Sequence, residues 1–186
     1  QVHRRQVFAH LVRAGAKTRV QFDIFGPVNI PSHEGYTYVH GFRYQEIVRE
    51  GKSYLNAGRL LVGAKGKSSP EVNYSHQLML VDLAVRADQV DVVRYDHAKE
   101  TLSIEHLAFL AECLIKGEWT PGGYMHQYIG PVEYGWVVAV SGALCNMAGA
   151  GIKDRRYWYV AMQYAILAED VLVTKDSNGA MTSSYM

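Results

Sequence analysis

Polar and basic side chains recur at steps of three and four residues in two stretches of the chain, residues 1–17 and 45–67. Such spacing places them on one face of an α-helix. In the first stretch a few apolar side chains lie on another face of the helix. In the second stretch the apolar face is narrow and includes glycines. The polar line of residues 45–67 consists of Gln45, Arg49, Lys52, Asn56, Arg59, Gly63 and Lys67. The pattern predicts two basic amphipathic helices.

Three glycines interrupt the second predicted helix: Gly51, Gly58 and Gly63. Each costs about 1 kcal/mol relative to alanine in a helix interior. A helix with this sequence would need a partner outside itself, and its glycines would let that partner come close. A basic helix with glycine notches suits a polyanion as the partner.

The connection between the two basic stretches breaks the helical pattern. Val20, Phe22 and Ile24 partly alternate with polar residues, which favours one short strand. Pro27 and Pro31 then exclude a continuous helix. The connection is therefore predicted to be irregular, with a single short strand.

The remaining two thirds of the chain read as about four helices with short breaks between them. Ser68, Pro70 and Glu71 form the start signal of the first, with the spacing of a capping box. The last two helices are rich in alanine and glycine, which permits close backbone approach. The expected helices run from Ser68 to between Ala87 and Arg94, from Ser103 to Gly117, from Pro131 to Ala148 and from Asp154 to Val173.

These patterns predict an all-α fold. A basic N-terminal helical arm, two helices with a Gly/Pro connector, would precede a bundle of roughly four helices. The expected division is an arm over residues 1–67, a bundle over residues 68–176 and a polar tail over residues 177–186.

The formal net charge of +1 hides a strong asymmetry. Residues 1–67 hold 11 lysines and arginines against 4 carboxylates, whereas residues 68–186 hold 8 against 14. An excess of positive charge in one part of a chain points to nucleic acid or another anionic surface.

No short motif indicates catalysis. The sequence lacks the glycine-rich nucleotide loops, the HExxH and CxxC pairs and the GxSxG elbow. His106 and Cys113 would lie about 10 Å apart on one helix, and a nucleophilic pair needs about 3 Å. His76, His97 and His126 show no metal spacing. No catalytic residue, metal or cofactor is therefore expected, and the chain is expected not to be an enzyme.

Two further features leave alternatives open. Cys113 and Cys145 read as two buried free thiols, with a disulfide as the alternative. Residues 134–152 carry no charge, which is borderline for a membrane span. Glycine, serine and asparagine within this run favour a buried helix of the bundle, and contact with a lipid envelope stays open.

The order of two basic helices, a Gly/Pro connector, an Ala/Gly-rich helical bundle and a polar tail resembles the coat proteins of filamentous archaeal viruses, in the rudivirus, lipothrixvirus and tristromavirus group. The resemblance implies an arm that wraps double-stranded DNA in A-form and a bundle that forms the filament wall. It also implies pairing with a second copy or with a related coat chain, and a location in the virion.

The same resemblance implies a DNA-contacting face on the arm. Its residues would be Arg4, Arg5, Arg13, Lys17, Arg19, Arg43, Arg49, Lys52, Arg59, Lys65 and Lys67. Such phosphate contacts carry no sequence information, and the chain shows no recognition-helix or zinc-finger pattern. The carboxylates of the arm would need to face away from phosphate; they are Asp23, Glu34, Glu46 and Glu50.

Two other classes of function stay open. A cellular chromatin or other non-specific DNA-binding protein would share the basic arm without forming filaments. A helical enzyme or membrane-associated protein would use the loop of residues 118–128 as a pocket. The sequence does not decide between DNA and RNA.

Overall fold

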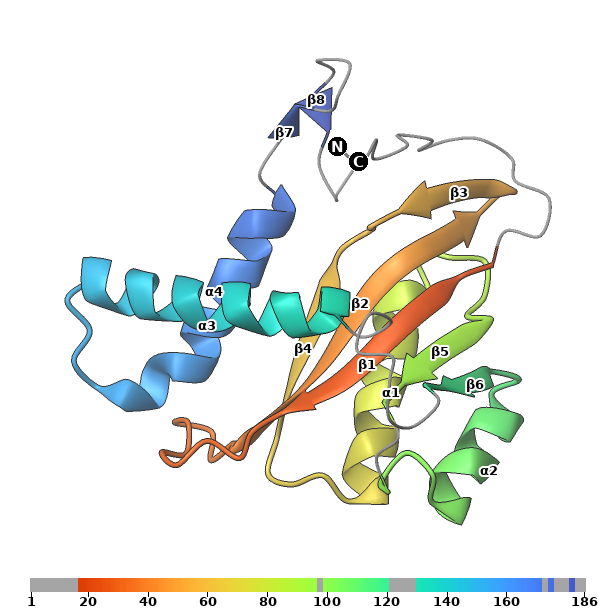
Figure 1. Ribbon diagram of the computed structural model, residues 1–186, viewed down its shortest axis with the longest axis horizontal. Helices are drawn as coiled ribbons and strands as arrows, with labels where there is room; N and C mark the ends of the chain where they lie inside the picture. Colours follow the sequence, from red (N-terminus) through yellow and green to blue (C-terminus); the bar gives the residue numbers. More distant parts are fainter. Residues whose placement is uncertain (1–16, 97–98, 121–129, 172–173, 176–180, 183–186) are drawn as a thin grey trace.

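The computed structural model describes residues 17–96, 99–120, 130–171, 174–175 and 181–182. A six-stranded sheet lies at the centre, with two helices on one face and two on the other (Figure 1). Its strand order is β3-β2-β1-β5-β6, and β4 also pairs with β2. The all-α prediction is therefore wrong, because a mixed sheet organises the chain.

The strands of the sheet are β1 (Arg19–Phe25), β2 (Tyr38–Arg49), β3 (Lys52–Leu55), β4 (Arg59–Ala64), β5 (Val92–Tyr95) and β6 (Lys116–Trp119). The helices are α1 (Ser69–Leu83), α2 (Ile104–Glu112), α3 (Gly130–Gly149) and α4 (Trp158–Val171), the last preceded by a short 3₁₀ helix (Arg155–Tyr157). A separate antiparallel pair consists of β7 (Thr174–Lys175) and β8 (Met181–Thr182).

The predicted basic helix of residues 45–67 is instead the end of β2 followed by β3 and β4. Glu50 and Gly51 both have positive φ, 51° and 71°, as a two-residue turn between twisted antiparallel strands requires. Asn56 and Gly58 likewise have positive φ in the turn before β4. Two of the glycines that weighed against a helix thus serve turns, and the basic residues are spread over three strands and the connection after β4.

The strand predicted around residues 20–24 is confirmed as part of β1. It pairs with β2 in antiparallel orientation and with β5 in parallel orientation. β5 has only four residues, and the sequence pattern assigned them to the end of a helix. β6 pairs in parallel with β5, where the pattern predicted the end of a helix and a loop.

The predicted helix starts after residue 67 are largely confirmed. Ser68 and Glu71 form the capping box of α1, and the Ser103 side chain accepts the His106 N–H at the start of α2. The Asp154 side chain accepts a backbone N–H ahead of α4. Each of these caps involves residues within one helical turn, so it can be predicted from the sequence alone.

Two clusters of buried apolar side chains lie on opposite faces of the sheet. One lies between the sheet and α1 and α2, and the other between the sheet and α3 and α4. α3 packs closely on α4, since a Cβ added at Gly142 would lie 2.6 Å from the Cβ of Ala165. The close approach expected from alanine and glycine is confirmed. The division at residue 67 stays a prediction, and the sheet draws strands from both sides of it.

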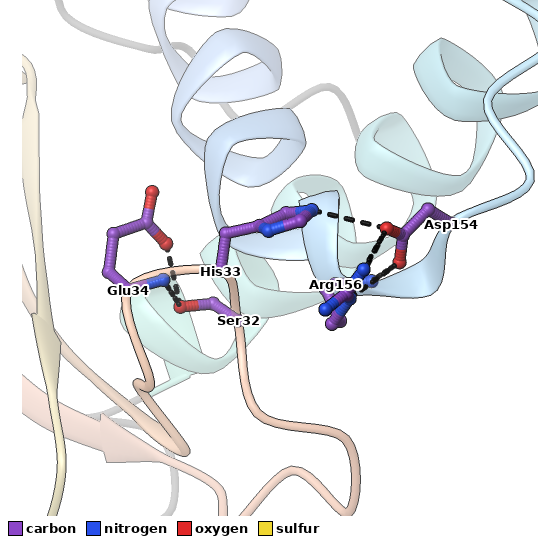
Figure 2. A network of polar contacts seen from close by, with 5 residues as sticks. All are labelled: Ser32, His33, Glu34, Asp154 and Arg156. Carbon is purple, nitrogen blue, oxygen red and sulfur yellow. Dashed lines mark hydrogen bonds and ion pairs between the residues drawn. The ribbon is translucent and has the colours of Figure 1, made fainter.

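The loop between β1 and β2 docks on the connection between α3 and α4 (Figure 2). The His33 Nε2 lies 3.2 Å from an Asp154 carboxylate oxygen, and Asp154 also accepts hydrogen bonds from the Arg156 guanidinium. The Trp158 indole donates to the Ile30 carbonyl oxygen at 2.8 Å. These contacts attach the far end of the α3–α4 hairpin to the sheet, through the loop that leaves β1.

The uncharged run of residues 134–152 falls mostly in α3. Its helix is half-buried rather than buried throughout: Trp136 and Ala139 face the core, whereas Val137 and Leu144 are exposed. Among the described helices, none is long and apolar enough to cross a membrane.

The two cysteines are both free thiols, as favoured from the sequence. Cys145 is exposed, so its predicted burial is wrong. Cys113 is partly buried, and burial raises the pKa of its thiol.

Candidate active site

Two aspartates lie close to the carboxyl ends of neighbouring parallel strands, Asp23 two residues before the end of β1 and Asp96 directly after β5. The register of β1 with β5 pairs residues 19–21 with residues 92–94. Continued for two residues, the same register brings Asp23 opposite Asp96. Ligands of sheets with parallel strands bind beyond these carboxyl ends, so the two carboxylates mark a candidate site.

Strand alternation fixes the face on which these aspartates lie. Phe22 and Tyr95, which directly precede them, are both buried against α1, with ring centroids 5.7 Å apart. Successive side chains of a strand point to opposite faces. Positions 23 and 96 therefore belong to the other face of the sheet, which α3 covers (Figure 1).

α3 holds the first aspartate in place. The Trp136 indole Nε1 donates to Asp23 Oδ2 at 2.7 Å, and the Ile24 backbone N–H donates to Oδ1 at 2.8 Å. Gly41 lies opposite Asp23 on β2, and a Cβ there would overlap the indole ring. The absence of a side chain at position 41 thus allows the tryptophan to reach Asp23.

A third carboxylate residue belongs to the same helix. Glu133 precedes Trp136 by three residues, and positions three apart share one face of a helix. Position 133 therefore lies on the face of α3 that meets the sheet at Asp23, one turn nearer the start of the helix. The Glu133 side chain lies outside the described residues, so this placement rests on the backbone alone.

The donor set suits a divalent cation held jointly with a substrate. Mg²⁺ is usually bound by one or two carboxylates together with waters and substrate phosphates. Asp23 and Asp96 supply two carboxylates at one edge of the sheet. Among the side chains that the structure describes, no three histidines, cysteines or carboxylates come close enough to hold a metal ion by themselves.

Charged pairs border the aspartates. Lys67 Nζ lies 2.6 Å from a Glu100 carboxylate oxygen, between the β4–α1 connection and the segment after Asp96. This hydrogen bond raises the pKa of Lys67, with a smaller contribution from the charge of Asp96, and it lowers the pKa of Glu100. On β5, Arg94 Nε donates to Glu118 at 3.0 Å, which lowers the pKa of Glu118.

The predicted DNA-contacting residues do not form one helical face. Arg4, Arg5 and Arg13 lie outside the described residues. The others lie at the start of β1 (Lys17, Arg19), on β2 (Arg43, Arg49), on β3 (Lys52), on β4 (Arg59) and in the β4–α1 connection (Lys65, Lys67).

Several of these cations have protein partners. Arg59 forms an ion pair with Glu169, and Arg49 donates to the Val85 carbonyl oxygen at 2.7 Å. Lys67 pairs with Glu100, four residues after Asp96, and the charge of Asp96 makes a small contribution to its raised pKa. The role of the set in nucleic-acid binding stays a prediction.

Sequence reasoning passed over the aspartates themselves. Asp23 entered only as a carboxylate that would have to avoid phosphate, and Asp96 fell between two predicted helices. Their shared signal is an aspartate within or directly after a short apolar strand. It has meaning only once the two strands are known to be parallel neighbours.

No family model and no curated protein matches the sequence. Among solved structures, a chain of the simian T-cell lymphotropic virus intasome in complex with the PP2A regulatory subunit B56 gamma matches with a TM-score of 0.66 and 13% identity. The match covers 95% of this chain and 56% of that chain, so this chain spans little more than half of it.

The HTLV-2 integrase catalytic core domain in complex with magnesium, in its trimeric form, matches with a TM-score of 0.61 and 14% identity. This match covers 89% of the present chain and 93% of that domain. The chain therefore has the fold of an integrase catalytic core.

These comparisons correct the expectations that rested on coat proteins. The resemblance to filamentous archaeal virus coat proteins is wrong, because the matching folds are integrase domains built on a sheet. The coat function and the coat-subunit and lipid partners lose their support with it. The expectation of no enzymatic role is overturned as well, since the shared fold is that of catalytic cores. The location in a virion stays a prediction.

Proposed function

We propose that this chain is the catalytic core of a metal-dependent enzyme that cuts and joins DNA strands. Asp23, Asp96 and Glu133 would hold the metal. The observation that carries the proposal is the parallel pairing of β1 with β5, whose register, continued for two residues, brings Asp23 opposite Asp96. The likeness to an integrase core that was solved with magnesium supports it.

Each residue has a distinct part in this proposal. A bound divalent cation would polarise the phosphoryl oxygen and lower the pKa of the attacking water or hydroxyl. The Asp23 carboxylate would meet the metal ion in one orientation, because the Trp136 indole and the Ile24 N–H each hold one of its two oxygens. Such outer hydrogen bonds orient a ligand and tune its affinity for metal. Glu133 adds a carboxylate from the first turns of α3.

DNA is the proposed substrate, and contact with its backbone does not depend on base sequence. The excess of positive charge over residues 1–67 supports a polyanionic partner. Lys67 supplies a cation that pairs with Glu100, four residues after Asp96, and would contact a phosphate of the DNA near the reacting bond. We also propose self-association, which the trimeric form of the HTLV-2 integrase core supports.

The first test is metal binding. Calorimetric titration with Mn²⁺ and Mg²⁺ should show binding that weakens at least tenfold in Asp23→Asn and in Asp96→Asn. Glu112→Gln is a matched control, because Glu112 is an exposed carboxylate of α2. Equal affinities in all four proteins would overturn the assignment of the site.

The second test is activity on DNA. The protein should nick or join strands of a labelled duplex with Mg²⁺ present and lose this activity in EDTA. Asp23→Asn, Asp96→Asn and Glu133→Gln should each lower the rate by at least 10³-fold, whereas Glu112→Gln should not. Cleavage that persists in EDTA or in the three variants would contradict the proposal.

A further inference from the structure

A buried tyrosine hydroxyl lies between two histidines directly behind the candidate site. The Tyr95 oxygen is 2.9 Å from His76 Nε2 and 3.1 Å from His106 Nε2. All three side chains are at most 1% exposed. They come from three elements, β5, α1 and α2, and we call them the His–Tyr–His cluster.

The hydrogen of the first histidine can be assigned from its neighbours. His76 Nδ1 lies 2.8 Å from the Val72 carbonyl oxygen, which only accepts, so Nδ1 carries a hydrogen. Burial lowers the pKa of His76 to about 3, so the ring is neutral near pH 7. Its Nε2 is therefore an acceptor, and the Tyr95 hydroxyl donates to it.

The second histidine must then donate to the tyrosine. With its own hydrogen given to His76, the Tyr95 oxygen accepts from His106 Nε2. Burial also lowers the pKa of His106, to about 4, so this ring is neutral and its Nδ1 accepts. The structure places Asn73 Oδ1 2.7 Å from that nitrogen. The oxygen and nitrogen of an amide exchange places when the group is flipped, and an accepting Nδ1 requires the amide N–H on this side. Each hydrogen bond in the row therefore donates in the same direction, which begins at the Asn73 amide, passes through His106, Tyr95 and His76, and ends at the Val72 carbonyl oxygen.

The cluster fixes the residue immediately before Asp96. The Tyr95 ring stacks on Trp119 of β6 with centroids 5.4 Å apart, and its carbonyl oxygen accepts the Thr120 N–H at 3.1 Å. Apolar packing would bury the ring equally well. Hydrogen bonds to two helices also set its position along the strand, and a shift of Tyr95 would leave buried polar atoms unpaired.

We propose that His76, Tyr95 and His106 are positioning residues that fix the carboxyl end of β5 and thereby place the Asp96 carboxylate opposite Asp23. This inference rests on the proposed function, in which Asp96 binds the metal. The three residues touch neither metal nor DNA, and they act through the backbone that joins Tyr95 to Asp96.

The test compares two variants of the full chain. Tyr95→Phe keeps the stacked ring but leaves both Nε2 atoms without the hydroxyl. Val62→Ala is the control, because Val62 is buried on the same face of the sheet in β4, outside the cluster. We expect hydrogen exchange at the Thr120 amide to accelerate at least tenfold, and Mg²⁺ affinity to fall at least fivefold, in Tyr95→Phe alone. The exchange rate and the Mg²⁺ affinity are each measured at a temperature the same number of degrees below the melting temperature of the protein tested.

Asn73→Asp tests the direction of donation in a chain that keeps the hydroxyl. A carboxylate there can only accept, so His106 should become an imidazolium near pH 7, seen in its ¹⁵N spectrum. In the unmodified protein the spectrum should show hydrogen on Nδ1 of His76 and on Nε2 of His106. The opposite tautomer at either ring would overturn the assigned direction.

The outcomes separate this inference from the proposed function. Unchanged Thr120 exchange in Tyr95→Phe would overturn the anchoring of β5, whether or not metal binds. Faster exchange with unchanged Mg²⁺ affinity would overturn the role in placing Asp96. An unmodified chain that binds no divalent cation would overturn the proposed function, and the exchange result would then decide the anchoring alone.

Discussion

The Trp136 indole Nε1 lies 2.7 Å from Asp23 Oδ2, and this hydrogen bond joins α3 to the sheet at the candidate site. The same helix carries position 133 one turn earlier. A single contact therefore orients one carboxylate and fixes the first turns of α3 on the sheet.

Trp136→Phe should weaken this arrangement while keeping an aromatic ring on the sheet. A hydrogen bond to a charged group contributes about 1.5–3 kcal/mol, so we expect a loss of up to that size in the free energy of unfolding. We also expect a three- to tenfold loss of Mg²⁺ affinity. Urea denaturation and calorimetry measure the two.

Trp158→Phe is the control for that substitution. It also removes an indole hydrogen bond, to the Ile30 carbonyl oxygen, but at the far end of the α3–α4 hairpin. Metal affinity should stay unchanged there. Equal losses of affinity in both variants would show that Trp136 acts through general stability.

Gly41→Val should displace the indole, because even a Cβ at position 41 overlaps the ring. Overpacking of this kind typically costs about 1–3 kcal/mol, and the bond to Asp23 should be lost. Tryptophan fluorescence should change, and metal affinity should fall together with stability. Gly149→Ala should alter neither fluorescence nor affinity, because no atom lies within 4 Å of the added carbon.

The stability of the chain should fall in mild acid. Burial lowers the pKa of His40, of His76 to about 3 and of His106 to about 4. The unfolded chain therefore binds protons from about pH 6.5 downward, while these folded histidines stay neutral.

The resulting loss of unfolding free energy is about 1.4 kcal/mol per pH unit for each such histidine. It begins below about pH 6.5 and ends as the pH falls through each folded pKa. Denaturant titrations at several pH values between 7.5 and 4.5 measure the slope. A flat profile would contradict the neutral state of the buried rings.

Lys67 and Lys52 distinguish the site from a uniformly basic surface. Both are exposed, but Lys67 pairs with Glu100 in the segment that follows Asp96. Lys67→Met should weaken binding to a random-sequence duplex and reduce the slope of log affinity against log salt by about 1. Lys52→Met should change it less. Equal effects would favour the distributed contacts predicted from the sequence.

The parts of the fold that could be predicted were those encoded locally. The caps at Ser68, Ser103 and Asp154 depend on residues within one turn, and all three mark helix starts as expected. The basic line of residues 45–67 failed because steps of three and four also occur by chance in a strand–turn–strand–turn–strand segment. Glu50-Gly51 was the better signal, since such pairs close tight hairpins.

The candidate site could not be predicted because it depends on pairing between distant strands. Asp23 and Asp96 are separate aspartates in the sequence, and only the parallel register of β1 with β5 relates them. The four residues of β5 are too few to show a strand period by themselves. Glu133 is related to the candidate site only because Trp136, three residues later on the same helix, contacts Asp23.

α3 is attached at two separated points, by Trp136 near its start and, beyond its end, by the docked loop that His33 and Asp154 hold (Figure 2). Its 20 residues span about 30 Å, so position 133 and the docked loop lie near opposite ends of one helix. The docked loop therefore holds the α3–α4 hairpin on the sheet at a point remote from the candidate site, and it can stabilise the chain without setting the geometry of the carboxylates.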